Sequence, residues 1–200
     1  MEVNWEGTIE VAAPVETAYR YLADLPRHRE WAQSVERLEL QRPGDVDGVG
    51  ACYLTYERQG LQDDRRPHEE IGGRAGIVEK SLVEMRELVP NRRVALQAHS
   101  VPRKNIRVEI AFEFAPLTGG GTRVTQRIAM KMSPTAVLLA RLLLRVGPAE
   151  LRAKTEAQWR ASLENVRVVL AGMAGSEGVG RGPAGHEACL RGLGTGWGIA

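Results

Sequence analysis

Hydrophobic and polar residues alternate along the first eleven positions of the chain. Val3, Trp5, Ile9 and Val11 share one parity with Gly7 between them, and the other parity is polar or charged. A period of two is typical of a half-buried β-strand, because successive side chains point to opposite faces. We therefore predict that the chain opens with a strand that ends at Val11.

A helix is predicted immediately after this strand. Pro14 suits the first turn of a helix, and apolar side chains then recur at helical spacing as far as Leu22. The pattern breaks at residues 24–26. A second, short helical turn is expected over residues 27–35, with Trp31 as its one large apolar anchor.

The middle of the chain has the pattern of a series of strands. In the clearest pair, 106–114 and 124–132, the even-numbered positions are apolar apart from Gln126, and the glycines of 119–121 suit the turn between them. Residues 57–74 are nearly devoid of large apolar side chains, which indicates a long exposed loop or a hairpin tip. The predicted strands are 36–41, 50–56, 76–89, 93–101, 106–114 and 124–132.

Beyond residue 133 the hydrophobic period lengthens from two to about 3.6, which is typical of helices. A leucine-rich helix is predicted over 136–146, followed by a second helix that ends near residue 173. Ala153, Ala157 and Ala161 form a row of small side chains in the first half of this last helix. Such a row leaves space between a helix and a sheet, although alanine also serves simply to support helicity.

Length and composition indicate one domain and a tail. The chain has 200 residues, of which 43% are hydrophobic, and residues 1–173 hold all the periodic patterns. A chain of this size can bury a substantial single core. Residues 174–200 contain nine glycines and no apolar period, so we predict a disordered tail.

Charge and cysteine content exclude several classes of protein. The net charge is only +2, from 27 basic and 25 acidic side chains, so no nucleic-acid partner is expected. Cys52 and Cys189 lie too far apart for metal-ligand or redox-pair spacing and are interpreted as free thiols in a reducing compartment. Neither a leader-like apolar run nor a transmembrane segment is evident. The expected location is cytoplasmic.

Local runs carry a resemblance to a known superfamily. The run from Ile9 to Asp24, followed by Glu30 and Trp31, resembles the start of the polyketide cyclase/dehydrase and lipid-transport superfamily (SRPBCC), which includes START-like, Bet v 1-like and coenzyme Q-binding proteins. Residues 88–97 look like its strand-turn-strand element, and residues 134–172 look like its terminal helical region. The resemblance covers roughly residues 3–172.

The resemblance implies an α+β helix-grip fold. In that fold a curved antiparallel sheet wraps around a long C-terminal helix, with two short helices after the first strand, and encloses a deep apolar cavity. Members of the superfamily bind lipids, quinones, sterols or polyketides, and some cyclise or dehydrate a substrate. These properties are expectations for this chain.

Motifs for catalysis are not apparent in the sequence. It contains no phosphate-binding loop, no histidine pair with metal spacing and no nucleophile elbow, so catalytic residues stay unassigned and neither metal nor cofactor is expected. Gln126 is a polar residue at an apolar parity, and its amide either bonds Tyr53, Tyr56 or the backbone, or contacts a ligand. Tyr53 and Tyr56 have opposite parities, so at most one can point inward without a bulge. The predicted ligand-binding residues are Tyr56, Phe112, Phe114, Gln126, Ile128, Met130, Ala153, Ala157 and Ala161.

Two classes of function follow from this set. The first is binding or carriage of a hydrophobic small molecule such as a lipid, a quinone or a polyketide. The second is a polyketide cyclase, aromatase or dehydratase that uses the same cavity. Residues 136–146 are too few to span a bilayer, but their leucines and arginines also fit a transient contact with a membrane surface.

Overall fold

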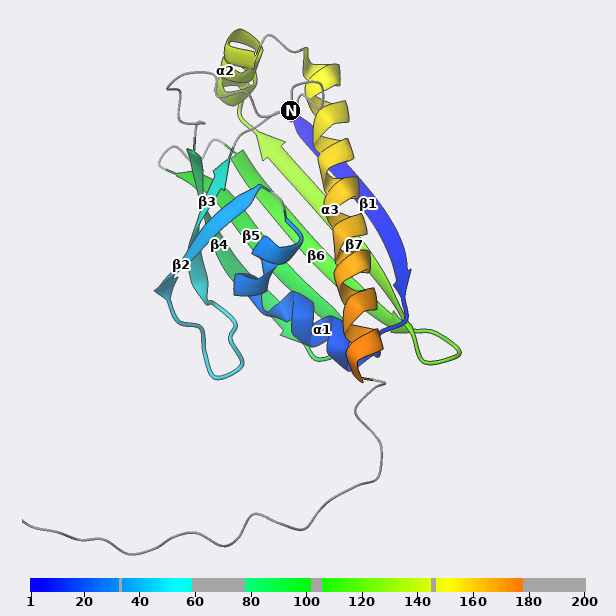
Figure 1. Cartoon of the computed structure of the whole chain (residues 1–200). Helices are drawn as coiled ribbons and strands as arrows, with labels where there is room; N and C mark the ends of the chain where they lie inside the picture. Colours follow the sequence, from blue (N-terminus) through cyan, green and yellow to red (C-terminus); the bar gives the residue numbers. More distant parts are fainter. Residues whose placement is uncertain (33, 59–77, 102–105, 145–146, 178–200) are drawn as a thin grey trace, which may run out of the picture.

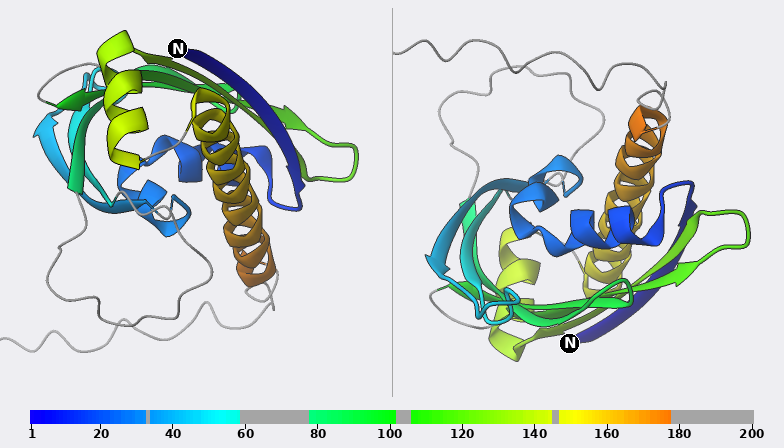
Figure 2. Two further views of the ribbon diagram at one scale, coloured as in Figure 1. Left: turned by 90° about the horizontal axis from the view of Figure 1, so that it is seen from above. Right: turned by 90° about the horizontal axis from the view of Figure 1, so that it is seen from below.

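Seven antiparallel strands form one curved sheet that wraps around a long helix (Figures 1 and 2). The computed structural model describes residues 1–32, 34–58, 78–101, 106–144 and 147–177. The strands lie in the order β1-β7-β6-β5-β4-β3-β2. They are β1 (Glu2–Val11), β2 (Val35–Arg42), β3 (Cys52–Arg58), β4 (Val78–Val89), β5 (Arg93–Val101), β6 (Ile106–Pro116) and β7 (Thr122–Met132).

The helices lie on the concave side of this sheet or close one end of it. They are α1 (Val15–Ala23), the 3-10 helix η1 (Leu25–Glu30), α2 (Pro134–Leu144) and α3 (Pro148–Glu177). The α+β helix-grip architecture is therefore confirmed. The short second helix differs from the expected span of 27–35: it starts directly after Asp24 and ends before Trp31, which caps it and is 6% exposed.

The alternation predicted for β6 and β7 is present in the burial of their side chains. Phe112, Val124 and Ile128 are buried on the concave face. The convex face carries charged side chains, where Arg127 contacts Glu6 and Glu113, each at 2.8 Å. Exposed pairs of this kind contribute roughly 0–1 kcal/mol each, so the buried face supplies most of the stability.

The core falls into two clusters along the concave face. The larger one joins α1, η1, the C-terminal half of α3 and the strands around Phe112, with Val94, Val166 and Leu170 fully buried. The smaller one lies under α2 and the start of α3, around Met130. None of the helices that the structure describes combines the length and the apolar character needed to cross a membrane.

Gly7 allows α3 to approach β1 closely. A Cβ atom added at this position would lie 2.5 Å from Cη2 of Trp5 and 2.9 Å from Cδ2 of Leu163 on α3. Real Cβ atoms do not make contacts this short. The missing side chain at Gly7 is therefore what lets α3 pack against the first strand.

Two sequence predictions fall on residues outside those described. These are the exposed loop, of which 59–77 are not described, and the glycine-rich tail from residue 178 onward. The last helix runs to Glu177, four positions beyond the expected end at 173.

Candidate ligand pocket

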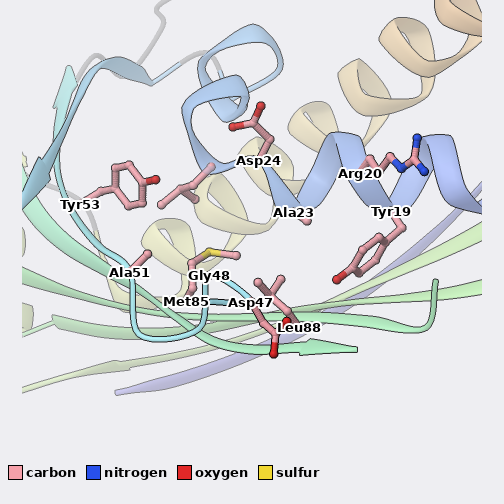
Figure 3. A pocket seen from close by; sticks show the side chains of 11 residues that line it. Tyr19, Arg20, Ala23, Asp24, Asp47, Gly48, Ala51, Tyr53, Met85 and Leu88 are labelled. Carbon is pink, nitrogen blue, oxygen red and sulfur yellow. The ribbon is translucent and has the colours of Figure 1, made fainter. Parts of the chain in front are cut away.

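An open pocket of about 370 Å³ lies between α1, the turn that joins β2 to β3, and strand β4 (Figure 3). Three separate segments of the chain, residues 19–25, 47–53 and 85–88, supply its walls. The lining residues are Tyr19, Arg20, Ala23, Asp24, Leu25, Asp47, Gly48, Ala51, Tyr53, Met85 and Leu88.

The turn between β2 and β3 is held in place by its own hydrogen bonds and by β4. Asp45 Oδ1 accepts the backbone N–H groups of Asp47 and Val49 at 3.0 and 2.9 Å. Gly48 has a φ of 89°, a left-handed conformation that favours glycine. The Met85 carbonyl accepts the N–H of residue 50 at 2.7 Å. These bonds fix one wall of the pocket.

A β-bulge in β4 directs two side chains into the pocket. Met85 pairs with Leu96 and Leu88 pairs with Val94, although Met85 and Leu88 have opposite parities. The register shifts by one residue between Met85 and Glu87, which turns Leu88 to the same face as Met85. With the buried Leu25 and Ala51, these side chains give the pocket an apolar floor.

Two tyrosines face this floor from opposite sides. Tyr19 comes from α1 and Tyr53 from β3, and both side chains point into the pocket (Figure 3). Burial raises the pKa of both phenols. The carboxylate of Asp47 raises the pKa of Tyr19 further, and that of Asp24 raises the pKa of Tyr53. Both hydroxyls therefore keep their protons at neutral pH.

His28 lies outside the pocket lining and packs within the core. Its Nε2 atom is 2.9 Å from the carbonyl oxygen of Leu22, and its ring lies 4.8 Å from that of Trp31. Burial lowers the pKa of His28 to about 4, and the bond to Leu22 opposes that shift. His28 is thus neutral near pH 7 and links η1 to the end of α1.

Tyr56, a predicted ligand-binding residue, does not point inward. Its hydroxyl donates to Oε2 of Glu39 at 3.1 Å, and the guanidinium carbon of Arg37 lies 4.1 Å from its ring centroid. Tyr53, at the opposite parity, lines the pocket instead. The choice of Tyr56 is therefore wrong, because the register of β3 turns it to the convex, charged face.

The predicted residues of β6 and β7 lie on the concave face but do not line the pocket. All five are buried: Phe112, Phe114, Gln126, Ile128 and Met130. Phe114 contacts one of the lining residues, with its ring centroid 5.8 Å from that of Tyr19. Within the described part of the chain, Oε1 of Gln126 has no hydrogen-bond partner, so this oxygen bonds neither a tyrosine nor the backbone there.

The alanine row of α3 turns away from the sheet. Ala153, Ala157 and Ala161 are exposed, whereas Leu163 and Val166 of the same helix are buried. At 100° per residue, the alanines fall on the side of α3 opposite to the buried stripe. The expectation that they line a cavity against the sheet is therefore wrong.

Sequence reasoning missed most of the pocket. Of its lining residues, only Tyr53 is a candidate for an inward orientation from the sequence, as the alternative to Tyr56. Asp47 and Gly48 belong to a turn with no apolar period, and Met85 and Leu88 have opposite parities. Among the described residues, no group of three or more His, Cys, Asp or Glu side chains could hold a metal ion.

The sequence matches one family model over almost all of the folded region. The chain belongs to the polyketide cyclase/dehydrase and lipid transport family, whose model matches residues 2–171. This confirms the resemblance seen in the N-terminal and C-terminal runs. No curated protein matches the sequence.

Solved structures share the fold at low sequence identity. The Zhui aromatase/cyclase from a Streptomyces strain is 15% identical, with a TM-score of 0.62, over 90% of this chain and 98% of that chain. A START superfamily protein from Mycobacterium smegmatis is 14% identical, with a TM-score of 0.57, over 87% and 98%. The di-domain StfQ of the steffimycin biosynthetic pathway is 17% identical, with a TM-score of 0.58, over 88% and 53%.

Proposed function

We propose that this protein binds or carries a hydrophobic small molecule in the pocket between α1 and β4. The observation that carries the proposal is the pocket itself. Its volume of about 370 Å³ lies within the range of roughly 300–1,000 Å³ common for ligand sites. Its apolar floor with a few polar groups is also typical of such sites. Membership of a family described by polyketide cyclisation and lipid transport supports the same conclusion.

Titration with the uncharged dye Nile red tests the proposal. The wild type is expected to give a saturable rise in fluorescence. Ala23→Phe is expected to weaken dye binding by about tenfold, because its ring would occupy volume that the ligand needs. Since Ala23 is only partly buried, this variant should keep a cooperative thermal transition.

Ala157→Phe is the matched control, because it makes the same change on the exposed side of α3. Dye affinity should stay at the wild-type value. Weakened binding in Ala157→Phe but not in Ala23→Phe would place the ligand site along α3 and contradict the pocket assigned here. Equal affinities in all three proteins would show that the dye binds elsewhere.

A cyclase or dehydratase reaction is the second candidate, and the neighbours of the two tyrosines favour it. Each phenol lies near a carboxylate, Tyr19 near Asp47 and Tyr53 near Asp24. Condensation within a polyketone needs a proton donor and a proton acceptor of this kind. Heptane-2,6-dione closes to 3-methylcyclohex-2-enone with loss of one water. The measurement is the rate of this ring closure with and without the protein. If the protein accelerates the closure and Tyr19→Phe abolishes the acceleration, catalysis is supported. A rate equal to that in buffer would leave binding as the function.

A further inference from the structure

The two pocket tyrosines present hydroxyl groups that no described residue uses. Tyr56, on the other face of β3, donates to Glu39, whereas no such bond forms at Tyr19 or Tyr53 within the ranges that the structure describes. Figure 3 shows both pocket side chains directed toward the space above Met85 and Leu88. A phenol can donate one hydrogen bond and also accept. Both hydroxyls are therefore available to the oxygen atoms of a ligand.

Because the phenols are protonated, they favour ligand oxygen atoms that accept a hydrogen bond. Burial and the nearby carboxylates raise the pKa of both groups, so each carries its proton and can donate at neutral pH. A ligand carbonyl oxygen only accepts and therefore complements such a donor. Because the tyrosines come from opposite walls, one ligand can be held at two ends with its apolar middle over the floor.

The charges at the rim act against an anionic ligand. Asp24 and Asp47 are exposed and line the pocket, and Arg20 is the single basic residue among the lining residues. No ion pair recorded for the described residues involves either carboxylate. Two carboxylates against one guanidinium give the lining residues a net negative charge, which repels a ligand carboxylate.

We propose that Tyr19 and Tyr53 are specificity-determining residues that select uncharged ligands with carbonyl oxygens toward both ends. Ligands of the same shape that end in carboxylates are rejected by Asp24 and Asp47. This inference rests on the proposed function, since it requires a ligand in the same pocket. It adds that the ligand carries carbonyl oxygens and that Tyr19 and Tyr53 bind them.

Three naphthalenes of similar shape test the proposal by displacement of Nile red. The probes are 2,6-diacetylnaphthalene, 2,6-diisopropylnaphthalene and naphthalene-2,6-dicarboxylate. The quantity measured is the ratio of the dissociation constants of the diketone and the hydrocarbon, which cancels apolar contributions. Tyr19→Phe and Tyr53→Phe are each expected to raise this ratio by about five- to tenfold, because the diketone loses one hydrogen bond and the hydrocarbon loses none. In the wild type the dicarboxylate should bind more weakly than the diketone.

Tyr56→Phe is the matched control, because it removes a phenol hydroxyl from the same strand but from the convex face. Its ratio should equal that of the wild type. If Nile red binds but both pocket variants leave the ratio unchanged, or if the dicarboxylate binds more tightly than the diketone, the inference is wrong and the proposed function stands. If Nile red does not bind the wild type at all, the proposed function itself fails.

Discussion

Gln126 carries a buried polar group whose oxygen is unpaired within the described residues. It is 2% exposed, lies opposite Phe112 on β6 and Gly7 on β1, and its Oε1 atom accepts no hydrogen bond there. An unpaired buried polar group costs about 1–3 kcal/mol, whereas an apolar group of the same shape does not. Gln126→Met is therefore expected to raise the free energy of unfolding by about 1 kcal/mol in urea denaturation.

Gln97→Met controls for the same change of side chain on the opposite face of the sheet. Gln97 lies on β5 with its amide facing the guanidinium of Arg107. This substitution should leave the free energy of unfolding unchanged or lower it slightly. A loss of more than about 1 kcal/mol in Gln126→Met would show that its amide has a stabilising partner, and would contradict the prediction.

His28 makes stability depend on pH. Its pKa is lowered to about 4 in the folded protein from an ordinary value of 6.5, so the unfolded chain binds the proton more readily. The stabilisation is complete above pH 6.5 and is lost as the pH falls from 6.5 toward 4. The loss amounts to roughly 3 kcal/mol, since each unit of pKa corresponds to about 1.4 kcal/mol.

Urea denaturation of the wild type and of His28→Gln between pH 7 and pH 4 measures this dependence. Glutamine keeps an N–H donor for the Leu22 carbonyl but does not titrate. The variant should therefore lose much less stability over this interval than the wild type does. Parallel curves for the two proteins would show that His28 is not the responsible group.

Two glycines show how elements depend on the absence of a side chain. Gly7 lies where α3 meets β1, and Leu163 and Trp5 already fill the space that a Cβ would need. Gly172 lies on the exposed side of α3, with no atom within 4 Å of an added Cβ. Gly7→Ala is expected to destabilise by about 1–3 kcal/mol, and Gly172→Ala to stabilise by up to about 1 kcal/mol.

Thermal melts of the two variants should therefore shift in opposite directions. The chemical change is identical, so the difference isolates the contact between α3 and β1. An unchanged melting temperature for Gly7→Ala would mean that Leu163 and Trp5 move aside at no cost. The close approach of α3 to β1 would then not depend on a glycine at position 7.

Most elements could be predicted from the sequence, because their periods are local. β5 was predicted with its observed bounds, Arg93–Val101, and α1 follows Pro14 as expected. The bulge in β4 could not be predicted in this way. It appears only in the pairing with β5, where Met85 and Leu88 come to face the same side. A period of two assigns those residues to opposite faces, so their shared role was hidden.

The functional site was less predictable than the elements. The sequence placed Phe112, Gln126 and Ile128 on the concave face correctly, because burial follows strand parity. It chose Tyr56 over Tyr53 because local parity does not show which face of β3 is buried. That follows from the register with β4, where Tyr53 lies opposite the buried Val83 and Tyr56 lies opposite Lys80. It also turned the alanine row of α3 inward, although those residues lie opposite the buried stripe.

At the scale of the whole molecule, the sequence alone determined the order of the elements, the family and the buried side of the regular strands such as β6 and β7. Those properties depend on hydrophobic periods and on short runs of neighbouring residues. Only the tertiary structure decided where the pocket lies. Its walls combine α1, the β2–β3 turn, β3 and β4, and the contacts that join them are made across a sheet between residues far apart in the chain. The hydrophobic period of a segment shows which of its side chains are buried, but it carries no information about which distant segment packs against them.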